Sequence, residues 1–66
     1  MVNRISEQRI KRNTTLEQLS EKSGIPVKEL AKYERQDYDI KKMSAVKAAH
    51  IAEALGCYIQ DLVYED

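Results

Sequence analysis

The 66-residue chain is predicted to form one small domain over residues 1–66, and a chain of this length buries only about 60% of the surface that it exposes when unfolded. It holds no apolar segment long enough to span a membrane and no signal-peptide pattern at its N-terminus, so we expect a cytoplasmic location. Its 11 basic and 11 acidic residues cancel, and a net charge of zero argues weakly against nucleic acid as a partner.

The charges are nevertheless segregated along the chain. Residues 1–47 hold all 11 Lys and Arg against seven Asp and Glu, a net charge of +4. Residues 48–66 hold the other four acidic residues and no Lys or Arg, a net charge of −4. Such a domain can offer a basic face to phosphate while its C-terminal part stays acidic.

Helix signals recur from the N-terminus onward, and strand signals are nearly absent. Asn3 can cap a first helix that runs to about Asn13, with Ile5 and Ile10 as its inward residues.

A second helix begins after the two threonines. Thr15 with Gln18 fits a capping box, and so does Thr14 with Glu17. Its inward face is expected to consist of Leu16, Leu19 and Ser23. Gly24 suits the left-handed position that ends a helix, so the second helix is predicted to stop there.

Pro26 fits the first turn of a third helix, where its missing N–H is not needed. Leu30 and Tyr33 lie three positions apart and are predicted to point inward. Residues 35–43 are polar and predict a loop, with Asp37 and Asp39 as turn formers.

Ser44 is expected to cap a fourth helix that Gly56 ends. Its inner face is expected to carry small side chains, namely Ala45, Ala48, Ala49 and Ala52, followed by Leu55. A short last helix over about residues 60–63 would dock Ile59 and Leu62. The predicted fold is therefore all-α and compact, with five helices.

The second and third helices fit a helix-turn-helix motif. Ser20 supplies the small residue that faces the incoming helix, and Gly24 follows four positions later. Ile25, Leu30 and Tyr33 then lock the second helix of the motif onto the first.

Several segments in order carry a family resemblance: TLEQLSEKSGI, KYER, IAEALG and YIQDLV. The chain resembles the lambda-repressor-like helix-turn-helix regulators, of the Cro and phage-repressor type. This resemblance implies a repressor-like transcription regulator of prokaryotic or phage origin, with the third helix in the major groove of DNA. It also implies a structural ion pair between Arg9 and Glu34, and a partly buried guanidinium beside Ile10 would need such a partner.

The expected partner is double-stranded DNA, bound by a two-fold homodimer, because one module of this size contacts little DNA. The outward side of the third helix, the start of the second and the loop after the third supply the contacts. The DNA-binding residues are predicted to be Thr15, Leu16, Val27, Lys28, Ala31, Lys32, Arg35, Gln36, Lys41 and Lys42. Tyr58, Val63 and Tyr64 are candidate dimer contacts.

Leu16, Pro26 and Val27 depart from the polar residues usual in the family, which removes the most direct hydrogen bonding to bases and leaves readout to Lys28, Lys32, Arg35 and DNA shape. An alternative function is therefore a protein-interaction module on the same fold, antitoxin-like or an anti-repressor component. The sequence shows no catalytic set, metal cluster or cofactor motif, so neither an enzyme nor a cofactor is expected. His50 is predicted to be a surface or partly packed residue rather than a catalytic base, and Cys57 to be a small packed residue.

Overall fold

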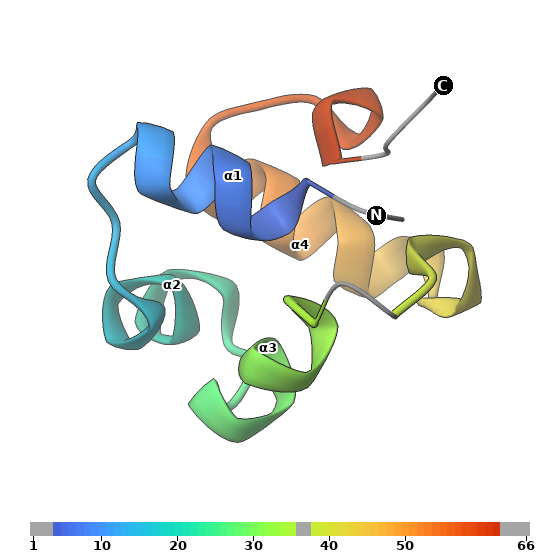
Figure 1. Ribbon diagram of the computed structural model, residues 1–66, viewed down its shortest axis with the longest axis horizontal. Coiled ribbons are helices and arrows are strands. Elements are labelled where there is room, and N and C mark those ends of the chain that lie inside the picture. The colour runs from blue at the N-terminus through green and yellow to red at the C-terminus, as the bar shows by residue number, and fades with distance from the viewer. Residues whose placement is uncertain (1–3, 36–37, 63–66) are drawn as a thin grey trace.

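The computed structural model describes residues 4–35 and 38–62, apart from the side chain of Lys41. Its elements in chain order are α1 (Ile5–Lys11), α2 (Leu16–Ser23), α3 (Val27–Tyr33), the 3-10 turn η1 (Ile40–Lys42), α4 (Ala45–Leu55) and the 3-10 turn η2 (Ile59–Leu62). The described residues contain no strand, so the all-α prediction is confirmed for them. Helix α2 packs against both α3 and α4, and η2 packs against α4 and α1 (Figure 1).

The helix ends follow the capping signals of the sequence. Thr15 and Gln18 form the capping box of α2: the Gln18 N–H donates to the Thr15 hydroxyl at 3.1 Å, and the Thr15 N–H donates to the Gln18 side chain at 2.9 Å. Ser44 accepts from the backbone N–H of Lys47 at 3.1 Å and caps α4. Gly24 and Gly56 end α2 and α4 with φ of 76° and 74°, a left-handed conformation that side chains disfavour.

The structure differs from the prediction for the first helix at its start, at its end and at Ile10. Its N-cap is Arg4, without a side-chain hydrogen bond, while Asn3 lies outside the described residues, and the helix stops at Lys11. Ile10 is 61% exposed, whereas Ile5 and Gln8 are buried. Residues five positions apart lie about 140° apart around a helix, so Ile5 and Ile10 cannot share an inward face.

The third helix begins one residue later than expected, because Pro26 is its N-cap, with ψ of 144°, rather than part of its first turn. The predicted loop after it contains η1, and Ile40 and Met43 on either edge of that turn are buried. Among the described residues the count is four α-helices and two 3-10 turns, so the expected fifth helix is the turn η2. Leu62 is docked there as predicted, but Ile59 is exposed.

The core draws on every element between α1 and η2. Its fully buried large side chains are Ile5, Leu19, Leu30, Ile51 and Leu62. The inner face of α4 was predicted in part, since Ala48, Ala52 and Leu55 are buried but Ala45 is exposed. Ile51 is also buried there, and the prediction from the alanines did not include it. Cys57 is packed partly against this core as predicted, and burial raises the pKa of its thiol.

Candidate nucleic-acid interface

Helix α3 is held to the domain by one face. Leu30 and Tyr33 are buried, and the helix packs chiefly against α2. The opposite face is exposed to solvent and carries Val27, Lys28, Ala31 and Lys32, and the exposed Arg35 follows two residues beyond the end of the helix. These five sequence-predicted residues are therefore brought together on one surface, which combines three cations with two small apolar side chains.

Lys28 and Lys32 lie one turn apart on this surface. Within residues 4–35 and 38–62, neither has a carboxylate partner within 4.0 Å. Two lysines at this spacing can meet successive phosphates or the O6 and N7 acceptors of guanine. Val27 and Ala31 between them offer only van der Waals contact, which suits a thymine methyl group.

The other predicted contacts lie away from α3. Thr15 is exposed at the N-cap of α2, where its hydroxyl already accepts a hydrogen bond from Gln18. Leu16 packs partly against the core. Lys42 is exposed at the end of η1. Gln36 and the side chain of Lys41 lie outside the described part of the chain.

Arg9 and Glu34 connect α1 to the C-terminal end of α3. The Arg9 Nε donates to one carboxylate oxygen of Glu34 at 2.6 Å, and the Nη2 donates to the other at 3.1 Å. The Nη1 donates to the backbone carbonyl of Thr14 at 2.9 Å. Only 18% of the Arg9 side chain and 12% of the Glu34 side chain are exposed. This bidentate pair fixes the end of α3 against the rest of the fold.

A second polar cluster connects α3 to α4, and the sequence did not reveal it. The Tyr33 hydroxyl donates to a carboxylate oxygen of Glu29, and the Lys47 ammonium donates to the same oxygen. The Lys47 Nζ also lies 3.1 Å from the Tyr33 hydroxyl. The Tyr33 ring packs at a tilt against Tyr38, with 5.0 Å between ring centroids.

The cluster shifts the pKa of each ionisable group in it. The hydrogen bond from Lys47, followed by that from Tyr33, lowers the pKa of Glu29. The same contacts with Glu29 and Tyr33 raise the pKa of Lys47. Burial, followed by the hydrogen bond to Glu29, raises the pKa of Tyr33. The folded protein therefore favours an ionised Glu29, an ionised Lys47 and a neutral Tyr33.

This cluster is expected to make the stability of the fold decrease as the pH falls into the acidic range. Because folding lowers the pKa of Glu29 below its ordinary 4.5, the stabilisation is present above pH 4.5 and is lost as pH falls through the folded-state pKa. Glu29→Gln removes this titration. The difference in unfolding free energy between wild type and variant should be largest near neutrality and shrink in acid. Urea denaturation between about pH 7 and pH 3 measures it, and a pH-independent difference would contradict the assignment.

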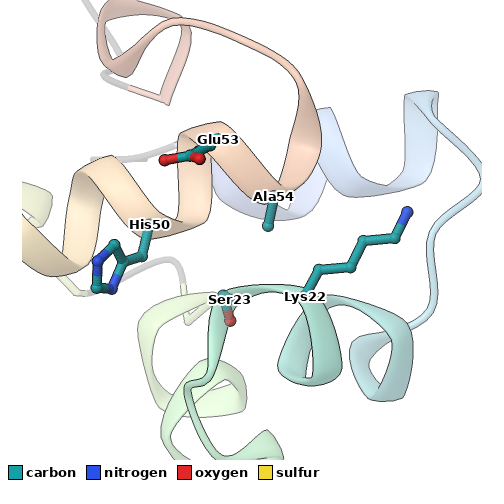
Figure 2. Close-up of a pocket in the computed structure, with 5 residues that line it drawn as sticks. All are labelled: Lys22, Ser23, His50, Glu53 and Ala54. Atoms are coloured by element: carbon teal, nitrogen blue, oxygen red, sulfur yellow. The ribbon is translucent and has the colours of Figure 1, made fainter.

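A cleft of about 490 Å³ lies between α2 and α4 (Figure 2). Its lining consists of Lys22, Ser23, His50, Glu53 and Ala54. His50 is exposed, as predicted, and the Ser23 hydroxyl accepts from the backbone N–H of Ile25 at 3.2 Å. In the described residues, no group of three or more His, Cys, Asp or Glu could hold a metal ion. Nor is any described helix long and apolar enough to cross a membrane.

An exposed basic helix face, with its other face locked through a glycine turn onto the preceding helix, is the architecture of a helix-turn-helix DNA-binding domain. The chain matches the family model described as helix-turn-helix over residues 5–62, and it belongs to this family, in the lambda-repressor-like group. Comparisons with curated proteins and with solved structures find no significant match. The family consists of DNA-binding regulators.

Proposed function

We propose that this protein is a repressor-like transcriptional regulator that binds double-stranded DNA as a homodimer, with α3 in the major groove. The observation that carries the proposal is the exposed face of α3, where Lys28 and Lys32 have no carboxylate partner in the described structure. Phosphate oxygens and the O6 and N7 atoms of guanine are the DNA groups that bind lysine side chains.

In this arrangement Val27 and Lys28, at the start of α3, lie deepest in the groove, and Lys32 and Arg35 lie nearer its edge. The apolar Val27 and Ala31 exclude water from thymine methyl groups instead of forming hydrogen bonds. Specificity then depends on the lysines and on the shape of the DNA more than on polar readout by the first residues of the helix.

Phosphate contacts beside the groove come from two flanks. Lys42 on η1 supplies one cation, and Lys41 precedes it in the same turn. At the start of α2 the Thr15 hydroxyl accepts from Gln18, which leaves its own proton available to a phosphate oxygen. The side chain of Leu16 packs toward the core, so its contribution would come from the backbone N–H.

The size of the domain supports two copies on one operator. Its longest extent is 30 Å, and the half-sites of a two-fold operator lie about 34 Å apart, so neighbouring copies would approach each other. A mostly apolar surface near η2, whose lining includes Ala49, Cys57, Tyr58 and Ile59 together with Glu53 and Gln60, is available for that contact. Tyr58 is 78% exposed there. Val63 and Tyr64, the other candidate dimer contacts, lie outside the described residues.

The test is duplex binding as a function of salt, measured by fluorescence anisotropy. Lys28→Met and Lys32→Met should each weaken binding by about threefold to tenfold and lower the salt slope by about 0.9. Lys22→Met is the matched control, since Lys22 lies in the cleft between α2 and α4 (Figure 2). No salt-dependent binding at low ionic strength would refute DNA binding, and equal losses from all three variants would refute the role of α3.

A further inference from the structure

Lys47 occupies a position that its own helix disfavours. It lies in the first turn of α4, where its backbone N–H is bound by the Ser44 cap and where no acidic residue accompanies it. The start of a helix carries a partial positive charge, so a cation there is unfavourable. Tertiary contacts of the lysine side chain can offset this small cost.

Those contacts all lead to α3. The Lys47 ammonium donates to Glu29 and lies 3.1 Å from the Tyr33 hydroxyl and 5.8 Å from the centre of the Tyr33 ring. The backbone of α3 packs chiefly against α2 rather than against α4. The side-chain cluster is thus a direct link between α4 and the DNA-facing helix.

Glu29 also has a cation closer to it in the sequence than Lys47. Lys32 lies three positions further along α3, a spacing at which a glutamate and a lysine pair readily. Lys32 is close enough to help lower the pKa of Glu29, although less than Lys47 does. Yet the described structure gives Lys32 no ion pair, because the Glu29 carboxylate is turned to Tyr33 and Lys47.

We propose that Lys47 is a positioning residue for DNA binding: by occupying the Glu29 carboxylate, it keeps that carboxylate from pairing with Lys32 and leaves Lys32 available to DNA. Lys47 itself contacts no nucleotide in this arrangement. The inference rests on the proposed function, because it assigns a role to Lys47 only if α3 binds DNA.

The experiment compares duplex binding by Lys47→Met, Glu29→Gln and the double variant. Lys47→Met frees Glu29 to pair with Lys32 and should weaken binding by about twofold, because an exposed glutamate–lysine pair at this spacing is weak and Lys32 has only to break it to reach DNA. Removing the carboxylate as well should restore the wild-type affinity and the wild-type salt slope. Circular dichroism establishes that each variant is folded at the temperature of the measurement.

Coupling to Lys32 separates this role from a merely structural one. Lys32→Met should weaken wild-type binding by about threefold to tenfold. Its effect should be about twofold smaller in the Lys47→Met background, where Glu29 partly occupies Lys32. A double variant as weak as Lys47→Met, with a salt slope lower by about 0.9, would show a direct phosphate contact and overturn the inference.

Two further outcomes are distinguishable. If wild type binds DNA and Lys47→Met binds equally tightly, the inference alone is overturned. If wild type shows no salt-dependent binding, the proposed function is refuted and the inference with it. Glu29→Gln should bind at least as tightly as wild type, and a loss of binding in that variant would also overturn the inference.

Discussion

Replacing Arg9 with methionine is expected to lower the free energy of unfolding by about 3 kcal/mol. The substitution leaves the Glu34 carboxylate, only 12% exposed, without its bidentate partner. It also removes the donor that satisfies the Thr14 carbonyl at 2.9 Å. A chain of this length has a total stability of about 3–10 kcal/mol, so the variant should lose about a third or more of it and unfold at a clearly lower urea concentration.

Urea denaturation followed by circular dichroism measures this effect, with the slope m as a check that the transition stays two-state. Arg12→Met is the matched control, because Arg12 is exposed just beyond the same helix. It should change stability by no more than about 0.5 kcal/mol. Equal effects of the two substitutions would mean that the Arg9–Glu34 pair contributes little.

Ile51→Ala should destabilise the protein by about 3–4 kcal/mol. Ile51 is fully buried in the core, on the inner face of α4. The loss in stability has two parts, the hydrophobic stabilisation of the carbon atoms that the substitution removes and the cost of the cavity that they leave. Thermal and urea unfolding should both report it.

Val46→Ala is the control on the same helix, because Val46 is 65% exposed. Its effect should lie within about 0.5 kcal/mol of zero, since little apolar contact is lost and alanine favours the helix. A large effect at Val46 together with a small one at Ile51 would contradict the described orientation of α4.

The ends of α2 and α4 could be predicted because their signals are local. A threonine or serine cap acts within three residues, and a left-handed glycine acts at its own position, so Thr15, Ser44, Gly24 and Gly56 needed no tertiary information. The turns η1 and η2 could not be predicted as such, because three or four residues are too few to establish a period.

Burial was less predictable in the short helix α1. A helix of seven residues offers few inward positions, and here one of them is a glutamine, Gln8, while the more apolar Ile10 faces solvent. Hydrophobicity alone therefore predicted the wrong second buried residue of α1, Ile10 instead of Gln8. In α4 the alanine pattern predicted the inner face without Ile51. Helical spacing of three and four residues from Ala48 to Leu55 nevertheless places Ile51 on that same buried face.

The exposed face of α3 follows from helical periodicity once Leu30 and Tyr33 are placed inward. The role proposed for Lys47 could not be predicted from helical periodicity, because its contact with Glu29 joins residues 18 positions apart on different helices. The one local signal was a lysine in the first turn of a helix, where a cation is disfavoured. Such a misplaced charge is a reason to look for a partner elsewhere in the fold.

The central claim, that α3 is the DNA-reading surface, is tested most directly by titrating the isotopically labelled protein with a duplex at low ionic strength and following backbone amide shifts. We predict that the largest shifts fall within residues 27–35 and at the start of α2, and that added salt reverses them. Shifts confined to the cleft around His50 and Glu53, or to the apolar surface at Tyr58 and Ile59, would contradict the claim.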